Sequence, residues 1–278
     1  MCSSDLWSPT GNSEGIYTEA EILQARAEDP AVWQGEVTLV AALDPSFTNG
    51  GDRSAAVFGK LGRNLDGLLT LSFDNVYYLK EDITDKSTPR TFQIAKQFIA
   101  LCEKKGVTAK NAALDVSGGG APFADVLTSL WSNQFHRVNF AGKASDMPIS
   151  TFDQTLSSDR YANRVTELWF SGKELLRTGQ LKGIFPELAK EMCARLYISE
   201  KSGTAKVRAE PKPQMKARIG ASPDVADAAF ILVDLCRSKL GLSSAAVAGN
   251  AKDRKFIPWK ERFRRLDVTG RAGRFIRR

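Results

Sequence analysis

Apolar runs of strand length alternate with helically spaced apolar residues over positions 36–240. The first run is β-branched and ends in a carboxylate, which is typical of a buried central strand. The next two runs follow an Asn-Gly-Gly turn signal and predict antiparallel neighbours of that strand. Five strands are predicted in all: Glu36–Asp44, Arg53–Leu61, Gly67–Leu79, Asn111–Val116 and His136–Ala141.

Helical periods fill the gaps between these strands and follow the last of them. A helix over Pro89–Lys105 is expected to end at Gly106, because glycine readily adopts the left-handed conformation that closes a helix. The other predicted elements are a short helix around Thr18–Ala27, helices over Pro122–Trp131, Ser158–Thr178, Phe185–Ile198 and Pro223–Lys239, and a basic hairpin over Lys201–Lys212.

The order of these elements limits the fold. Three strands joined by hairpins come first, and crossover connections then add parallel strands. Such crossovers are right-handed, so few sheet orders are open to the chain. The order that places the ends of the first and fourth strands side by side is ribonuclease-H-like. We therefore predict an α/β fold with a mixed five-stranded ribonuclease-H-like sheet flanked by helices.

With 278 residues, of which 42% are hydrophobic, the chain is long enough for one sizeable core. No apolar run approaches the roughly 18–20 residues that span a bilayer, and there is no signal-peptide pattern, so an intracellular protein without membrane contact is expected. The four cysteines are far apart, and His136 is the single histidine. A structural zinc site is therefore not expected.

Three segments are predicted: a lead-in over 1–35, of which 1–6 look non-native, a domain over 36–240, and a linker with a basic tail over 241–278. The natural chain is expected to begin further upstream. From Lys252 to Arg278 eleven Lys or Arg stand against three acids, a local charge of +8, while the whole chain carries +7. Such a tail predicts a polyanionic partner, because neutralised phosphates release counterions. A solvated tail without a fixed role, or one that docks on a protein, is the alternative.

Four aspartates stand where the predicted fold brings chain segments together. Asp44 and Asp115 each end an apolar strand before a glycine-containing loop, and ligands bind at such strand ends in open α/β sheets. Asp224 and Asp227 lie three residues apart on one face of the last helix. Taken alone, Asp44 could be a turn residue and Asp224 a helix cap. Their corresponding positions favour a shared site.

Carboxylates that converge need a cation, because like charges at close range repel. Oxygen ligands with no His or Cys nearby select Mg²⁺ or Mn²⁺ rather than zinc. Two such ions about 3.5–4 Å apart would activate a water and stabilise the leaving 3′ oxygen of a phosphodiester. The predicted reaction is therefore metal-dependent phosphodiester hydrolysis.

Four segments carry a family resemblance. Leu43–Ala56 has an Asp followed by a Gly-Gly-Asp turn, and Leu114–Val126 has an acidic strand end followed by a glycine loop. Arg160–Trp169 reads RYANRVTELW, and Ile219–Leu232 reads IGASPDVADAAFIL, which is the most specific of the four. In this order they resemble the motifs of the nuclease half of tailed-phage terminase large subunits, over about residues 36–240.

The resemblance implies an endonuclease that cuts double-stranded, concatemeric DNA during phage genome packaging in the host cytoplasm. It implies that Asp44, Asp115 and Asp227 are catalytic metal ligands, with Asp224 as a fourth acid. The implied partners are a packaging ATPase domain, a small terminase subunit and a portal. The sequence contains no GxxxxGK[ST] motif, so ATP-driven translocation is not expected of this chain alone.

Basic residues are predicted to line a groove for the DNA backbone: Arg160, Arg164, Lys206, Arg208, Lys212 and Lys216. For Arg164 the alternative is an ion pair with Glu167 or Asp159, and for the run before the last helix it is a solvated hairpin. Trp169 is expected in the core. Asp52 is expected to take part in a turn beside the site.

Two other functions are alternatives to a packaging nuclease. A junction resolvase or transposase-like nuclease of the same fold accommodates the acids equally well. A non-catalytic module that binds DNA or a portal is opposed by the acids, because a module that binds an anion gains nothing from four carboxylates.

Overall fold

The computed structural model of the protein describes residues 13–27, 31–46, 53–198 and 206–245. Residues 1–6, Asp52, Lys201 and the basic tail lie outside these ranges, so the predictions that concern them stay predictions. Among the described helices, none has both the length and the apolar character that crossing a membrane requires.

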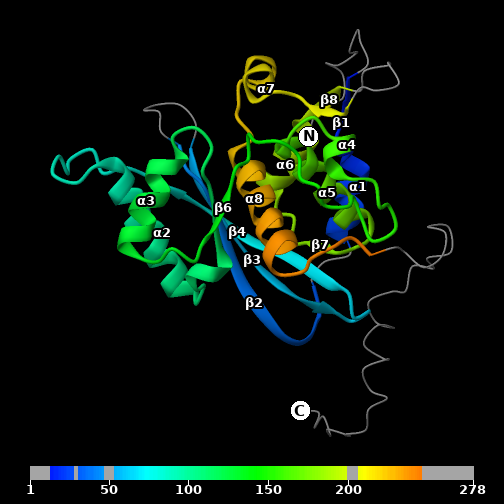
Figure 1. Cartoon of the computed structure of the whole chain (residues 1–278), viewed down its shortest axis with the longest axis horizontal. Coiled ribbons are helices and arrows are strands. Elements are labelled where there is room, and N and C mark those ends of the chain that lie inside the picture. Colours follow the sequence, from blue (N-terminus) through cyan, green and yellow to red (C-terminus); the bar gives the residue numbers. More distant parts are fainter. Residues whose placement is uncertain (1–12, 28–30, 47–52, 199–205, 246–278) are drawn as a thin grey trace, which may run out of the picture. The chain divides into compact units, whose positions relative to one another are not determined.

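Six strands form the main sheet of the described part, in the order β6-β5-β2-β3-β4-β7 (Figure 1). They are β2 (Trp33–Asp44), β3 (Ser54–Asn64), β4 (Leu69–Leu79), β5 (Ala112–Asp115), β6 (His136–Val138) and β7 (Leu181–Lys182). β2, β3 and β4 pair antiparallel, and β5, β6 and β7 join in parallel. The predicted ribonuclease-H-like sheet is confirmed, with β7 added. β7 was not predicted, because a strand of two residues is too short to give a periodic pattern of apolar positions.

β2 and β5 lie side by side, as predicted for the first and fourth strands. Their parallel register pairs Leu43 with Leu114, so Asp44 and Asp115 follow at matching positions. Neighbouring strands are about 4.7–4.9 Å apart, which brings the two aspartates to one edge of the sheet. A short 3₁₀ turn, η2 (Ala109–Asn111), leads into β5.

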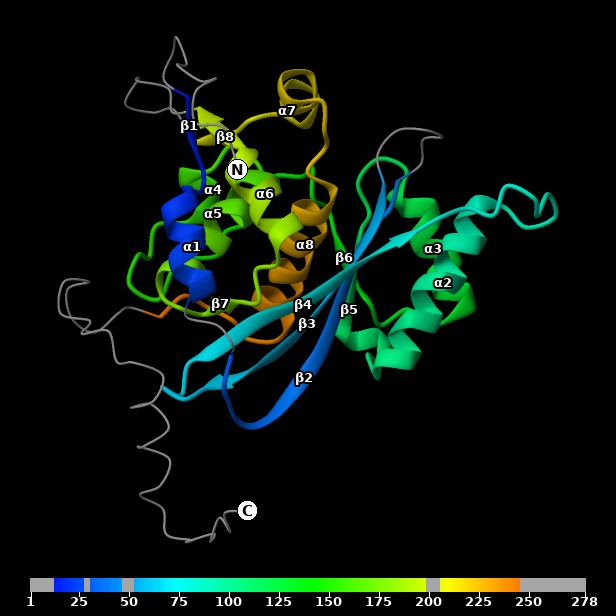
Figure 2. The same ribbon diagram turned by 180° about the vertical axis from the view of Figure 1, so that it is seen from behind.

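Helices cover both faces of the sheet (Figures 1 and 2). On one face α2 (Arg90–Lys105) and α3 (Gly120–Leu130) bury a core of their own with the sheet. On the other face α8 (Asp224–Lys239) packs against the sheet, and α5 (Arg164–Arg177) and α6 (Pro186–Ala194) pack against α8. α8 is therefore enclosed between the sheet and two helices, and every residue from Asp224 to Arg237 is buried.

Small residues let α8 come close to the sheet. Ala226, Ala228 and Ala229 are fully buried. A Cβ added at Gly59 of β3 would already touch the side chain of Leu232 at 3.4 Å and would lie only 2.8 Å from a backbone oxygen of β4, so the glycine leaves no spare room between the sheet and the helix. This packing fixes the first turn of α8 beside the end of β2.

The predicted helix over Ser158–Thr178 is wrong in one respect, because it is two helices. α4 spans Ser157–Arg160, and α5 begins only at Arg164. Asn163 between them is extended, and its side-chain oxygen accepts hydrogen bonds from the backbone nitrogen and the hydroxyl of Thr166. A side-chain cap of this kind starts a new helix and separates it from the preceding turn.

The predicted helix over Phe185–Ile198 is also too long, because α6 is followed by a strand. β8 (Leu196–Ile198) pairs with β1 (Ser13–Gly15) and β9 (Arg208–Ala209) in a small antiparallel sheet. These partners lie elsewhere in the sequence, so the local pattern could not reveal them. α7 (Lys212–Ile219) begins where the predicted basic hairpin ends.

The lead-in segment contributes to the core of the described body. α1 spans Glu19–Ala27, and Ile16 and Tyr17 before it are buried. The hydroxyl of Tyr17 donates to the backbone oxygen of Trp169 at 2.6 Å, and its ring stacks on Phe230 with centroids 6.0 Å apart. The domain boundary at residue 36 stays a prediction, but Ile16 and Tyr17 pack as part of the same body.

Candidate active site

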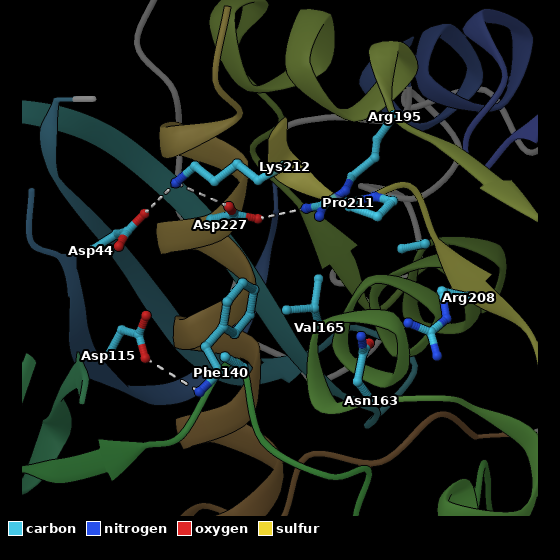
Figure 3. Close-up of a pocket in the computed structure, with 12 residues that line it drawn as sticks. Asp44, Asp115, Phe140, Asn163, Val165, Arg195, Arg208, Pro211, Lys212 and Asp227 are labelled. Carbon is cyan, nitrogen blue, oxygen red and sulfur yellow. Dashed lines mark hydrogen bonds and ion pairs between the residues drawn. The ribbon is translucent and has the colours of Figure 1, made fainter. Parts of the chain in front are cut away.

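Asp44, Asp115 and Asp227 line one cleft of about 340 Å³ (Figure 3). β2 and β5 carry Asp44 and Asp115 at their last residues, and α8 carries Asp227 in its first turn. The walls of the cleft also include Phe140, Asn163, Val165, Arg195, Arg208 and Lys212. Three of the predicted ligands thus come together from segments that are far apart in the sequence.

The ammonium group of Lys212 lies among these carboxylates. Its Nζ is 3.1 Å from Asp224 Oδ1, 3.5 Å from Asp227 Oδ2 and 3.6 Å from Asp44 Oδ2. Burial opposes the charge of Lys212, but attraction by Asp227, Asp44 and Asp224 outweighs burial and raises its pKa well above the usual value. The point where three acids converge is therefore a place for positive charge.

Asp224, the fourth predicted acid, is 2% exposed at the start of α8. Its Oδ2 accepts a hydrogen bond from the backbone nitrogen of Arg53 at 2.9 Å. Among the described residues, its buried Oδ1 accepts no hydrogen bond of regular geometry, and Lys212 Nζ stands 3.1 Å away. A cation beside this oxygen therefore offsets the cost of burying it.

Asp115 is oriented by the loops that follow β5 and β6. Its Oδ1 accepts a hydrogen bond from the backbone nitrogen of Ser117 at 2.8 Å. It accepts a second from the backbone nitrogen of Phe140 at 3.2 Å (Figure 3). The glycine loop makes this turn possible, because Gly118 has a φ of +54° and a Cβ at Gly120 would lie 2.2 Å from the backbone oxygen of Asp115. These glycines serve a tight turn beside the acid.

Burial and neighbouring acids raise the pKa of two of these carboxyl groups. Burial raises the pKa of Asp44 well above its usual range; Lys212 opposes this, and the charges of Asp227, Asp115 and Asp224 add to it. Burial likewise raises the pKa of Asp115. A divalent cation in the cleft would relieve both effects, because a positive charge favours the ionised carboxylate.

The chemistry of this donor set fits a hard divalent cation. Asp44, Asp115 and Asp227 line the described cleft, Asp224 lies beside Lys212, and no His or Cys lines the cleft. A set of carboxylate oxygens of this kind suits Mg²⁺ or Mn²⁺. In the present arrangement, however, no three His, Cys, Asp or Glu side chains of the described ranges stand close enough to hold a metal ion. Because Lys212 Nζ lies at the point where the acids converge, a metal ion there requires the ammonium group to withdraw.

Four of the residues predicted to bind DNA are exposed, and one of them lines the cleft. Arg208 lines the cleft itself and is exposed. Arg160 is next to it, because Val207 donates a backbone hydrogen bond to Arg160 at 3.0 Å. Lys206 and Lys216 are also exposed, the latter on α7. Their binding of DNA stays a prediction.

Arg164, by contrast, is directed into the interior. Its Nη1 lies 2.7 Å from Glu167 Oε1, its Nη2 pairs with Asp234, and the side chain is only 11% exposed. Of the two roles considered for Arg164, the ion pair with Glu167 is present. The DNA contact stays a prediction that its position does not favour.

Two residues that contact Asp227 were not predicted to belong to the site. Arg195 Nη1 lies 2.9 Å from Asp227 Oδ1, and Trp169 Nε1 donates to the same oxygen at 3.2 Å. Trp169 was expected only as a core residue, and it is indeed fully buried. Arg195 fell inside a predicted helix, and no local pattern distinguishes it from other arginines.

Comparison with known proteins bears on the fold. Family models give no match to this chain, and no curated protein matches it in sequence. Among solved structures, the nuclease domain of the large terminase subunit of bacterial virus Sf6, with manganese and beta-thujaplicinol, is similar with a TM-score of 0.55 and 18% identity. The match covers 79% of this chain and 98% of that chain. A structure from the same subunit of bacteriophage Sf6, with calcium, gives the same values. The chain therefore has the fold of this terminase nuclease domain.

Proposed function

We propose that this chain is a metal-dependent endonuclease that cuts double-stranded, concatemeric DNA during packaging of a phage genome. The fold shared with the Sf6 nuclease domain supports this proposal, and so does the resemblance of four sequence motifs. The observation that carries it is the meeting of Asp44, Asp115 and Asp227 at one cleft, with Asp224 beside them. A fold alone does not specify chemistry, whereas convergent acids do.

Asp44, Asp115 and Asp227 would hold Mg²⁺ or Mn²⁺, with Asp224 as the fourth acid. The bound ions would supply an activated water and stabilise the leaving 3′ oxygen of the phosphodiester. The chain itself orients the ligands: backbone nitrogens of Ser117 and Phe140 fix Asp115, and the backbone nitrogen of Arg53 fixes Asp224. Preset ligands bind a metal ion without first losing rotational freedom.

Lys212 would have two positions in this scheme. Without metal, its ammonium group offsets the repulsion between Asp44, Asp224 and Asp227. With a divalent cation held by these acids, Lys212 would no longer be needed as their counter-charge, and its flexible side chain would be available to contact a phosphate at the edge of the cleft. Metal binding and DNA binding would thereby support each other.

The DNA backbone would run along the basic side of the cleft. Arg208 lines the cleft opposite the acids, with Arg160 and Lys206 close by and Lys216 on α7 (Figure 3). Contacts to phosphates position a duplex without reading its sequence, so little sequence preference is expected. The domain over 36–240, the basic tail over 241–278, the ATPase, small-subunit and portal partners, and the host cytoplasm as location belong to the same proposal.

Cleavage of a supercoiled plasmid tests this function. The wild-type chain is expected to nick and linearise the plasmid with Mn²⁺ or Mg²⁺ and to be inactive with EDTA. Asp44→Ala removes a ligand and is expected to lower the rate at least about 100-fold. Asp125→Ala is the matched control, because Asp125 is an exposed acid on α3 outside the cleft.

The alternatives give different results in the same assay. DNA binding that is independent of metal, with no cleavage by the wild type in Mn²⁺ or Mg²⁺, would contradict the proposal and indicate a non-catalytic module. Strong preference for four-way junctions over linear duplex would indicate a resolvase of the same fold instead.

A further inference from the structure

The two oxygens of Asp227 have different surroundings. Oδ1 lies 2.9 Å from Arg195 Nη1 and 3.2 Å from Trp169 Nε1. Oδ2 lies 3.5 Å from Lys212 Nζ, in the cleft (Figure 3). The carboxylate is therefore held from the protein side by one oxygen and offers the other to the cation site.

Arg195 is itself immobilised by several contacts. It is 3% exposed, and its Nε donates to the backbone oxygen of Glu210 at 3.0 Å. Its guanidinium carbon lies 4.7 Å from the centroid of the Trp169 ring, and its own backbone oxygen accepts from Ile16 at 3.0 Å. A planar guanidinium can make the Asp227 and Glu210 contacts together while it stacks on the indole, which a lysine ammonium cannot do.

Trp169 is fixed as firmly. It is fully buried in α5, its ring centroid is 4.7 Å from that of Phe230 in α8, and its backbone oxygen accepts from Tyr17. The indole nitrogen therefore cannot turn away from Asp227 without repacking the core. Two elements that are remote in sequence, α5 and the segment after α6, thus determine the rotation of one carboxylate on α8.

We propose that Arg195 and Trp169 are positioning residues for Asp227, which hold its Oδ1 so that Oδ2 alone is presented to the divalent cation. This inference rests on the proposed metal-dependent function. Partners that orient a metal ligand in this way make its affinity for the ion higher, because the ligand is ordered before the ion arrives.

Titration calorimetry with Mn²⁺ alone, on the full chain without DNA, tests the inference. Trp169→Phe keeps the packed ring and removes the donor, so Mn²⁺ affinity is expected to fall about 5-fold, the value of one ordinary hydrogen bond. Arg195→Lys keeps the charge and loses the fork, and a fall of about 10–100-fold is expected. Saturating Mn²⁺ is expected to restore plasmid cleavage in both variants, which a loss of folded protein would not allow.

Two further variants serve as references. Trp131→Phe makes the same replacement in the other core, where Trp131 packs edge-on against Phe98, and is expected to leave Mn²⁺ affinity unchanged. Asp227→Asn is expected to weaken Mn²⁺ binding more than either positioning variant. Circular dichroism melts of the metal-free proteins establish that each variant is folded, and if Arg195→Lys is not, Trp169→Phe decides alone.

The outcomes separate this inference from the proposed function. Wild-type Mn²⁺ affinity in Trp169→Phe and Arg195→Lys, with weakened affinity in Asp227→Asn, would overturn the positioning role and leave the metal site intact. Absence of Mn²⁺ binding by the wild type, or unchanged affinity in Asp227→Asn, would overturn both.

Discussion

α8 carries buried acids at two levels along its axis, and the charges that surround the acids differ between the two levels. Near its start, Asp227 shares the cleft with other aspartates around Lys212. Seven residues later, about two turns along the helix, Asp234 pairs with Arg164 and lies 3.2 Å from His136 Nε2. The first level gathers negative charges, whereas the second alternates charges of both signs.

The pKa shifts follow this difference. At the second level burial opposes ionisation, but the hydrogen bond from His136 and the charge of Arg164 lower the pKa of Asp234. Glu167 beside it is fully buried, yet Arg164, Ser145 and Arg237 lower its pKa despite that burial. In the cleft, burial and neighbouring acids raise the pKa of Asp44.

Burial of an acid therefore does not by itself indicate function. The second level joins α5, α8 and β6 through paired charges, and its acids have all the partners that they need. In the cleft the arrangement of charges differs, because Asp44, Asp224 and Asp227 lie around one ammonium group, that of Lys212, and the pKa of Asp44 stays raised in spite of it. A carboxyl group that its neighbours do not fully stabilise as an anion, together with access to a cleft, distinguishes the first level from the second.

Breaking the paired level is expected to have the largest effect on stability. Glu167→Gln removes the negative charge that Arg164 and Arg237 share, and loss of one charge of a buried pair costs about 3–5 kcal/mol. The free energy of unfolding in urea measures this loss. Asp159→Asn, at an exposed acid, is the control. A loss below about 1 kcal/mol for Glu167→Gln, within the range of an exposed pair, would show that this level is not structural.

The same comparison explains what the sequence could and could not reveal. Asp44 and Asp115 could be predicted as site residues because each ends an apolar run. This local pattern also predicts that each aspartate lies at the end of a strand. The contacts of Arg195 with Asp227 and of β8 with β1 join residues that are far apart in sequence, so no local period marks them. The break at Asn163 depends on one side-chain hydrogen bond inside an otherwise helical pattern.

Removing one negative charge from the cleft is expected to stabilise the metal-free protein, by less than Glu167→Gln destabilises it. Asp44→Asn removes a carboxylate that is repelled by its neighbours, so the metal-free protein is expected to gain about 1 kcal/mol of unfolding free energy near pH 8. Urea unfolding in EDTA measures the gain. A loss as large as that of Glu167→Gln would place Asp44 among the structural pairs instead.

The pH dependence of that gain sharpens the contrast. The pKa of Asp44 is raised by folding, so between about 4, its unfolded value, and the raised value the folded protein binds more protons and loses stability as pH rises. The difference between Asp44→Asn and wild type is therefore expected to grow from about pH 4 upward. Acids whose pKa is lowered by folding, such as Asp234, show the reverse trend. Their contribution to the free energy of unfolding is present above about pH 4, the unfolded value, and is lost as the pH falls below it. Unfolding curves at several pH values in EDTA measure both trends, and a difference that shrinks with rising pH would contradict the account.

The smallest effect on the unfolding free energy is expected at an exposed charge pair that belongs to neither level of α8. Arg177 and Glu174 form an exposed pair at 3.3 Å near the end of α5, with the arginine 62% exposed. Arg177→Ala is expected to change the unfolding free energy by less than about 0.5 kcal/mol, because solvent screens such pairs. If Arg177→Ala lowered the unfolding free energy as much as Glu167→Gln, burial would not explain the difference between buried and exposed charge pairs.

Anomalous diffraction from crystals grown with Mn²⁺ tests most directly whether the cleft is a divalent-cation site. The account predicts a manganese peak bounded by Asp44, Asp115 and Asp227, with the ammonium group of Lys212 moved away from the three carboxylates that it now contacts. No peak at saturating Mn²⁺, with Lys212 still in place among the acids, would contradict it.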